Sequence, residues 1–203
     1  MENYIITAIV KSPAGVSVRI ERGDEGEEYL ISEKVFRGLS YTEGCEISCE
    51  EAESLRCEAE YLRAAARTLK ILSYSSHSKS ALVRKLCHYG FDREIAIRAA
   101  DSAEEAGDLD EKRQAAHLCD YYIRHKYWGK KRIAAELMSR GYGKEAVLHA
   151  IASAEDERFA RNLGRLIENK PVPEDKEGRD RYIASLARMG YSVQEILRAI
   201  DEV

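Results

Sequence analysis

A block of helix, glycine turn and helix occurs three times along the chain, and this repetition constrains the fold more than any other feature. The middle copy spans residues 128–151 and reads WGKKRIAAELMSRGYGKEAVLHAI. It aligns with sequence 51 residues earlier and 49 residues later. The shared framework is Leu82, Leu86, Gly90, Phe91 and Ala99 in the first copy, Ile133, Leu137, Gly141, Tyr142 and Ala150 in the second, and Leu186, Gly190, Tyr191 and Ala199 in the third. Because one such unit buries too little apolar surface alone, neighbouring copies must stack.

Each framework glycine marks the end of a helix. In the middle copy Ile133, Leu137 and Met138 have the spacing of one helical face, and this pattern stops at Gly141. A helix C-terminus favours a residue that adopts positive φ, so we predict that conformation at all three glycines. The aromatic residue after each glycine is expected to fill the core beside the turn. The next helix then begins at an N-cap residue, and the three caps are Asp92, Gly143 and Ser192.

A further helix precedes each block, which gives three helices per repeat. In repeat one it spans residues 50–75, begins at the capping box of Ser48 and Glu51, and carries an apolar stripe. The stripe consists of Leu55, Ala59, Leu62, Ala66, Leu69 and Leu72. We assign residues 48–106, 107–153 and 154–203 to the three repeats, with an exposed proline-containing loop at 169–181 inserted in the third. The expected fold is mainly α, an elongated curved array of these repeats.

Residues 1–47 read differently and predict a small β-rich N-terminal element. β-branched and alternating patterns suggest short strands at residues 4–10, 16–20 and 29–31, separated by glycine-containing turns. Val35, Phe36 and Leu39 then form a brief helical stripe. A sheet this small must pack tightly on itself or against the following helices.

Composition excludes several classes of protein. The sequence is 44% hydrophobic and 33% charged, which disfavours disorder, and no signal peptide or transmembrane pattern is visible. We therefore expect a cytoplasmic protein. Five cysteines without CxxC spacing predict free thiols and no metal site. No phosphate-binding loop, nucleophile elbow or zinc-protease motif occurs, and the five histidines are scattered, so we expect no catalytic residues and no cofactor.

The net charge of −4 hides an uneven distribution: residues 1–60 carry −8, residues 61–153 carry +6 and residues 154–203 carry −2. The middle segment alone would attract a polyanion or an acidic protein surface. Its most basic stretch, residues 124–132, surrounds the single tryptophan with cations. The candidate partner-binding residues there are Arg124, Lys126, Trp128, Lys130, Lys131 and Arg132, with Lys79, Arg84 and Lys85 on the corresponding helix of repeat one.

Three interpretations of residues 124–132 remain open at this level. Aromatic residues among cations are typical of single-strand nucleic-acid binding, where bases stack and phosphates are neutralised. Tryptophan and arginine are equally favoured anchors at protein interfaces. The structural alternative is a tryptophan packed between two helices beside a solvated basic turn.

The three glycine-aromatic turns resemble the repeat of the RecX family of bacterial recombination regulators. The resemblance covers residues 60–203. Acidic openings before the second and third repeats add to it, at Leu109-Asp110-Glu111 and at residues 155–160, as does the segment Gly129-Lys130-Lys131-Arg132-Ile133. The N-terminal strands are similar to a short extension that some members carry. The proline-containing loop of the third repeat departs from the pattern.

This resemblance implies a non-enzymatic protein that binds RecA filaments on single-stranded DNA, and we expect it to be a monomer. Such a protein inhibits RecA ATPase and strand exchange and thereby modulates recombination and DNA repair. The alternative is a helical module that contacts nucleic acid directly. We expect salt-dependent binding to bare single strands in that second case and inhibition of RecA in the first.

Overall fold

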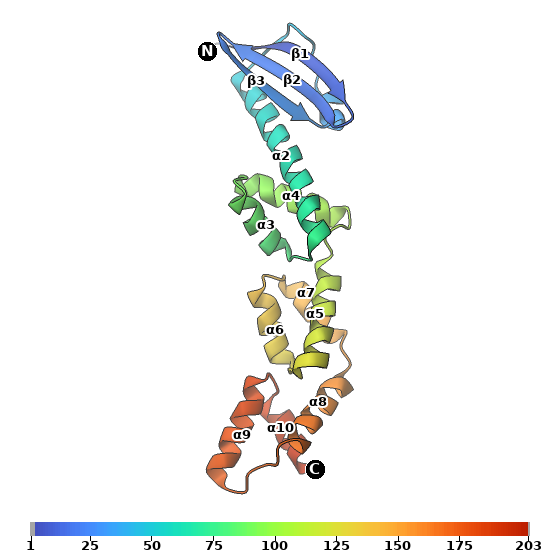
Figure 1. Cartoon of the computed structure of the whole chain (residues 1–203), viewed down its shortest axis with the longest axis vertical. Coiled ribbons are helices and arrows are strands. Elements are labelled where there is room, and N and C mark those ends of the chain that lie inside the picture. The colour runs from blue at the N-terminus through green and yellow to red at the C-terminus, as the bar shows by residue number, and fades with distance from the viewer. Residues whose placement is uncertain (1–2, 203) are drawn as a thin grey trace. The chain divides into compact units, whose positions relative to one another are not determined.

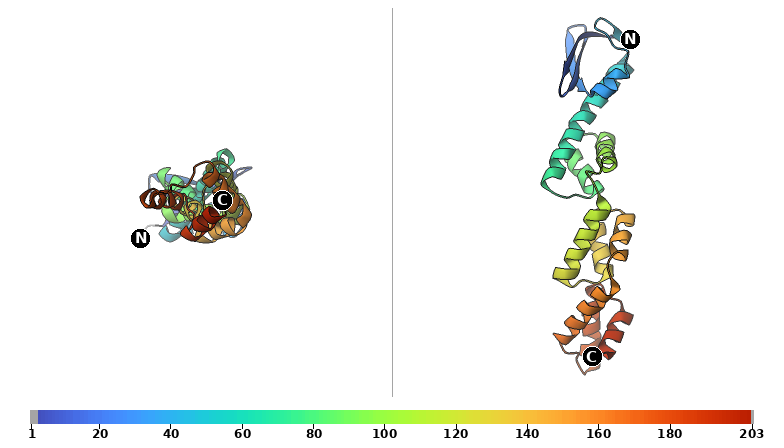
Figure 2. Two further views of the ribbon diagram at one scale, coloured as in Figure 1. Left: turned by 90° about the horizontal axis from the view of Figure 1, so that it is seen from below. Right: turned by 90° about the vertical axis from the view of Figure 1, so that its right-hand side faces the viewer.

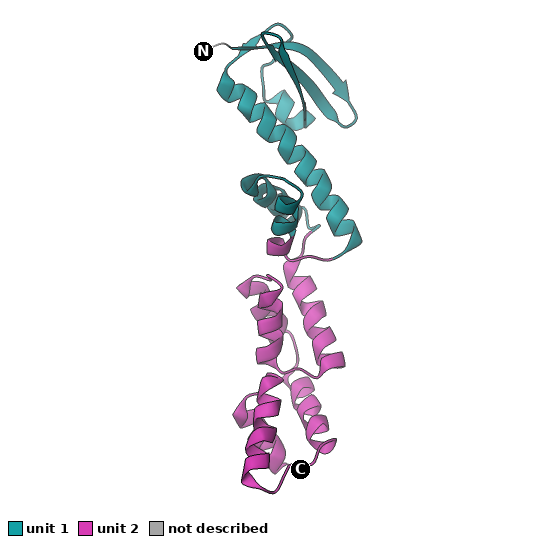
Figure 3. Ribbon diagram, turned by 60° about the vertical axis from the view of Figure 1, so that its left-hand side comes forward, with its two compact units in different colours: residues 1–75, 82–108 teal, residues 76–81, 109–203 magenta. Residues whose placement is uncertain are grey.

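The computed structural model describes residues 3–202, so the outermost positions of the 1–47 and 154–203 segments lie outside the described residues (Figure 1). The described chain is mainly helical with a small N-terminal antiparallel sheet, as predicted. It forms two compact units, one of residues 1–75 and 82–108 and the other of residues 76–81 and 109–203 (Figure 3). The first unit contains the sheet and most of repeat one. The second contains repeats two and three.

The sheet has four strands in the order β3-β2-β1-β4, all antiparallel. They are β1 (Tyr4–Ser12), β2 (Gly15–Arg22), β3 (Glu25–Ile31) and β4 (Glu46–Ile47), and α1 (Glu33–Arg37) lies between the last two in sequence. The two-residue β4 is too short to produce a sequence pattern and was not predicted. The start of helix α2 lies beside the sheet (Figures 1 and 2). Ile6, Val18 and Ile20 of the sheet are fully buried in a core that they share with the start of this helix.

Helix α2 (Cys49–Tyr74) begins at the predicted Ser48–Glu51 capping box. Its predicted stripe is correct at Leu55 and Ala59 but wrong further along, where Ala66 and Leu69 are exposed. Ala64, Thr68 and Ile71 are buried there instead. The reason is tertiary, because the helix packs against β3 early in its length and against α4 (Arg93–Glu105) later, so it needs two buried faces.

Three helices form each repeat, as the sequence predicts. After α2, repeat one continues with α3 (Lys79–His88) and α4. Repeat two contains α5 (Glu111–Lys126), α6 (Lys130–Ser139) and α7 (Lys144–Ala152), and repeat three contains α8 (Asp156–Glu168), α9 (Lys176–Arg188) and α10 (Val193–Asp201). The predicted loop at 169–181 is too long by six residues. The Asp175 side chain accepts a hydrogen bond from the backbone N–H of Gly178, which caps α9 and makes residues 176–181 helical.

The three glycine turns have the same backbone geometry. Gly90, Gly141 and Gly190 have φ values of +91°, +85° and +99°. In each case the aromatic residue after the glycine donates its backbone N–H to the backbone carbonyl of the framework leucine five positions earlier. The Tyr142 N–H, for example, lies 3.2 Å from the Leu137 carbonyl oxygen. This is the Schellman arrangement that ends a helix. It explains why leucine, glycine and aromatic residue recur at fixed spacing.

The framework side chains differ in burial. Leu82, Leu86, Ile133, Leu137, Leu186, Tyr142 and Tyr191 are buried. Phe91 is only half-buried, so the expected core plug is incomplete in repeat one. Met138, placed on the core face by its spacing, is 49% exposed because it lies about 100° around the helix from Leu137. Repeats two and three share one continuous core, which joins Leu137 and Tyr142 to Phe159, Leu163 and Leu186.

Candidate functional site

The basic stretch at residues 124–132 lies where repeat two meets repeat three. The backbone N–H of Gly129 donates to the Met189 carbonyl at 2.8 Å, and that of Lys131 donates to the Gly190 carbonyl at 3.2 Å. A Cβ atom added to Gly129 would lie 2.5 Å from the Gly190 carbonyl group. The connection between α5 and α6 therefore docks backbone to backbone on the glycine turn of repeat three. Both glycines are required by this close approach.

A related contact occurs one repeat earlier within the second unit. The hydroxyl of Ser78, which is buried, donates to the Arg140 carbonyl at 2.8 Å, and a Cβ atom on Gly141 would lie 3.1 Å from that hydroxyl oxygen. Ser78 also accepts a hydrogen bond from the backbone N–H of Ala81, which makes it the N-cap of α3. The turns at Gly141 and Gly190 thus each dock on a segment of the preceding repeat, and both contacts lie within the second unit.

Trp128 packs inside the joint between repeats two and three. Its ring is half-buried and stacks on Tyr122 with 4.7 Å between ring centroids. The Arg132 guanidinium also lies over the Trp128 ring, 4.3 Å from its centroid, and donates to the Arg188 carbonyl at 3.2 Å. Trp128 and Arg132 therefore have a structural role at the joint, which is the packing alternative raised by the sequence.

The other cations of the stretch divide into paired and unpaired groups. The Lys130 ammonium lies 2.6 Å from a carboxylate oxygen of Asp156, and Arg124 lies 2.8 Å from Asp120. Lys126 and Lys131 are exposed and have no ion-pair partner within residues 3–202. These two lysines are the members of the stretch that a binding partner can reach without breaking an existing contact.

The candidates of repeat one are less uniform than the sequence suggested. Arg84 is exposed on α3, whereas Lys85 is half-buried. Lys79 is held through its backbone, whose N–H donates to Glu111 at 2.6 Å. The structure thus gives these three cations different environments.

Sequence reasoning missed a cluster of arginines on α8. Arg158, Arg161 and Arg165 recur at i, i+3 and i+7, which places them on one helical face. Together with Arg124 of α5 they line a pocket of about 190 Å³, which Tyr127 also borders. The spacing was visible in the sequence, but the meeting with α5 was not. We call this the arginine pocket.

Tyr127 has the only positive φ among the described non-glycine residues, +52°. A left-handed conformation costs a residue with a side chain about 1–2 kcal/mol. It is maintained because the Tyr191 hydroxyl donates to the Tyr127 carbonyl at 2.9 Å across the joint. Burial raises the pKa of the Tyr191 hydroxyl, which keeps this donor protonated.

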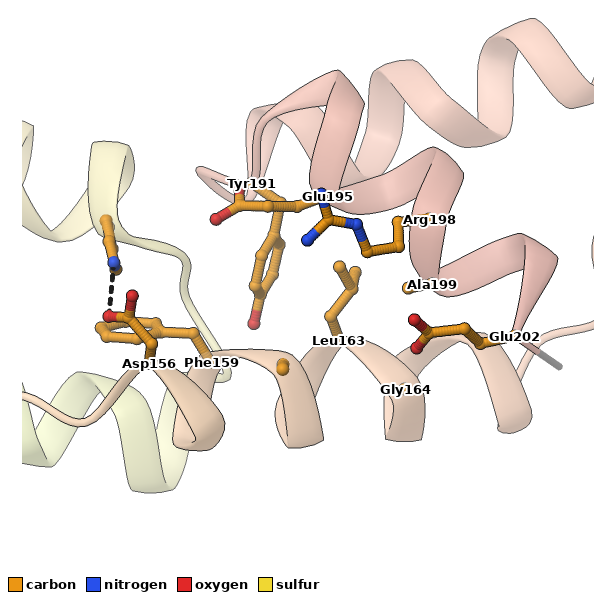
Figure 4. A pocket seen from close by; sticks show the side chains of 11 residues that line it. Asp156, Phe159, Leu163, Gly164, Tyr191, Glu195, Arg198, Ala199 and Glu202 are labelled. Atoms are coloured by element: carbon orange, nitrogen blue, oxygen red, sulfur yellow. Dashed lines mark hydrogen bonds and ion pairs between the residues drawn. The ribbon is translucent and has the colours of Figure 1, made fainter.

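A second, larger pocket of about 380 Å³ lies between α8 and α10 (Figure 4). Phe159, Leu163 and Tyr191 supply its apolar and aromatic lining, and charged residues including Arg198 and Glu202 lie at its rim. Ala160 also lines it and occupies the repeat position of Glu60 and Glu111, so the third repeat has a smaller side chain there.

Three further expectations from the sequence concern a metal site, the cysteines and membrane-spanning helices. Among residues 3–202, no group of three histidine, cysteine or acidic side chains is arranged to hold a metal ion. The cysteines are free thiols, and burial raises the pKa of Cys119 to about 11. None of the helices in this range is long and apolar enough to cross a bilayer.

These features define a tandem helical-repeat protein whose repeats dock through glycine turns. The sequence is 33% identical over 135 residues to regulatory protein RecX of Stenotrophomonas maltophilia (strain R551-3), a match that covers 66% of this chain and 82% of that protein. It is 22% identical to regulatory protein RecX of Clostridioides difficile (strain 630), with 93% and 96% covered. The chain belongs to the RecX family. No protein-family model matches it.

Solved structures share the fold. A crystal structure of regulatory protein RecX superposes with a TM-score of 0.74 at 17% identity and covers 98% of this chain and all of that one. RecX from Lactobacillus salivarius gives a TM-score of 0.62 at 14% identity, with 71% of this chain covered. The match of the first structure includes the N-terminal sheet as well as the repeats.

Proposed function

We propose that this protein regulates recombination by binding RecA filaments on single-stranded DNA, where it inhibits ATP hydrolysis and strand exchange without being an enzyme. The observation that carries the proposal is membership of a family whose members are named regulatory proteins, with a relative matched over 93% of the chain. The RecA target itself comes from the family resemblance recognised in the sequence. The proposal includes a cytoplasmic location and a monomeric state.

Tandem repeats suit a target that is itself periodic. Each repeat presents its helices in the same order, so successive repeats can meet successive protomers of a polymer. Linked weak contacts of this kind raise overall affinity by about 10² to 10⁴ where the geometry allows simultaneous binding. Strong contacts at any single repeat are then unnecessary.

Within the basic stretch, we assign the RecA contact to Lys126 and Lys131. Both are exposed and unpaired among the described residues, while Trp128, Lys130 and Arg132 hold the joint that presents them. Arg84 of repeat one is the further exposed candidate. Rim charges of this kind contribute mainly to association rate and orientation, and screening by salt weakens them.

The test is to titrate the protein into RecA ATPase on single-stranded DNA. We expect inhibition at less than one molecule per RecA protomer, and weaker inhibition for Lys126→Ala with Lys131→Ala. The control is Lys176→Ala with Arg179→Ala, which removes the same charge from exposed positions on α9. No inhibition at stoichiometric levels would refute the proposal, and equal inhibition by both double variants would refute the assignment to Lys126 and Lys131.

The alternative function is direct binding to nucleic acid, with effects on RecA secondary or absent. The arginine pocket supports this alternative, because it gathers guanidinium groups that can bind phosphates. A protein that acts only in this way would bind bare single strands with steep salt dependence and leave RecA ATPase unchanged when DNA is in excess. A protein that responds in neither assay would instead be a scaffold for another partner.

A further inference from the structure

The arginine pocket gathers positive charge from two separate helices. Arg124 comes from the last turn of α5, and Arg158, Arg161 and Arg165 come from one face of α8. The three arginines of α8 are 34 or more positions from Arg124 in sequence, and they meet Arg124 only because α8 packs against α5. The chain as a whole is acidic, so this local excess is not a consequence of composition.

Two of the four arginines are held in place. One carboxylate serves both, because Asp120 lies 2.7 Å from Arg158 and 2.8 Å from Arg124. The buried Asn162 donates its side-chain amide to the Ile123 carbonyl at 2.7 Å, which fixes α8 against the end of α5. Fixed guanidinium groups lose less conformational entropy when they bind an anion.

The other two arginines are available for a ligand. Arg161 and Arg165 are exposed, and no residue within 3–202 forms an ion pair with either. Asp120 is the single carboxylate that the structure pairs with this group, so the pocket keeps a positive charge. A planar guanidinium binds an oxyanion through two parallel hydrogen bonds, and several together recognise phosphate.

Tyr127 supplies a second, independent observation. A helix that ends in a left-handed residue normally has glycine there, yet α5 ends with a tyrosine held in that conformation by Tyr191. The strain places a 36% exposed aromatic ring on the border of the arginine pocket. Backbone strain that persists next to a binding pocket is characteristic of functional positions.

We propose that the arginine pocket binds a backbone phosphate of single-stranded nucleic acid and that Tyr127 stacks on an adjacent base. An acidic protein segment could pair with the arginines, but an exposed aromatic ring beside unpaired guanidinium groups also matches a ligand in which phosphates alternate with bases, where rings stack and cations neutralise phosphates. The proposal deepens the alternative function by naming the residues and the parts of the nucleic acid that would meet, and it concerns a contact that exists without RecA.

The experiment is fluorescence anisotropy of labelled oligo(dT) with the full chain and no RecA, at several salt concentrations. We expect Arg161→Gln with Arg165→Gln to weaken binding at least about tenfold. Each lost phosphate contact should reduce the magnitude of the negative slope of log K against log salt concentration by about 0.7, so the loss of two arginines should reduce it by about 1.4. Tyr127→Gly removes the ring while suiting the left-handed backbone, and it should weaken binding by about 5- to 150-fold.

The matched control is Lys176→Gln with Arg179→Gln, which removes the same charge from α9 of the same repeat. Circular dichroism checks that each variant is folded, and Tyr127→Phe should bind like the natural protein. Equal weakening by the control, unchanged binding in the arginine variant, or capture of polyglutamate in preference to oligo(dT) would each overturn the proposal. RecA ATPase is measured in parallel, since inhibition that survives loss of DNA binding leaves the proposed function intact.

Discussion

At the residue scale, the three framework glycines share one conformation but have different surroundings. A Cβ atom at Gly90 would meet nothing within 4 Å, and one at Gly141 would lie 3.1 Å from the Ser78 hydroxyl. At Gly190 it would lie 2.4 Å from the backbone nitrogen of Arg132. Positive φ explains the glycine in all three turns, but close approach between repeats adds a second requirement at the last two.

We therefore predict a graded loss of stability for alanine at these positions. Gly90→Ala should cost about 1–2 kcal/mol, the strain of a left-handed alanine. Gly141→Ala should cost somewhat more, and Gly190→Ala the most, because the backbone of the joint must separate. Hydrogen exchange of peptides that cover each turn measures the local free energy of opening. A loss at Gly90 as large as that at Gly190 would contradict the docking role of the third turn.

At the scale of elements, one carboxylate serves two helix N-termini. Glu111 of α5 accepts a backbone N–H from Lys79, at the start of α3, and another from Gly143, the N-cap of α7, at 2.6 and 3.4 Å. Gly143 has no side chain to cap α7, and Glu111 accepts the N–H of Gly143 itself, so it satisfies one backbone donor at each helix start and places a favourable charge at both helix dipoles. Glu60 has the same place in repeat one and accepts the N–H of Asp92 at 3.1 Å.

This difference predicts unequal effects of removing the two glutamates. Glu111→Ala should lower the free energy of unfolding by about 1–2 kcal/mol, because both helix ends lose an acceptor. Glu60→Ala should cost less, since the Asp92 side chain still caps α4. Urea unfolding followed by circular dichroism provides the comparison. Glu111→Gln serves as the control that keeps one acceptor oxygen, and its stability should fall between that of the natural protein and that of Glu111→Ala.

At the scale of the whole molecule, the chain is divided into two compact units with separate cores. The first includes the buried face of the sheet with the start of α2, and the second includes the continuous core of repeats two and three. Units of this size commonly unfold as independent cooperative transitions.

We predict two unfolding transitions that respond to different substitutions. Leu137→Ala, in the core of the second unit, should destabilise that unit by about 2–5 kcal/mol, and Ile20→Ala should have a similar effect on the first. Urea titration monitored by hydrogen exchange assigns each transition to its residues. One transition that both substitutions shift equally would show that the two units unfold together.

The sequence by itself determined the features that depend on local interactions. The glycine turns, the capping box at Ser48, the N-cap at Ser192 and the threefold order of helices all rest on hydrogen bonds between residues two to five positions apart. Such contacts are encoded by residue type and spacing, so repetition in the sequence revealed them. The same local reasoning supported the strands of the N-terminal sheet, apart from the two-residue β4.

Only the tertiary structure decided which residues are free to bind a partner. It turned the second half of α2 onto a different face, added six residues to the start of α9, and packed Trp128 between Tyr122 and the exposed Arg132 side chain at a joint. It also brought Arg124 to the arginines of α8. Each of these results depends on packing between segments that are distant in sequence. Periodicity reports the hydrophobicity of a helix face but not the neighbour that covers it, and that neighbour determines which charges remain available.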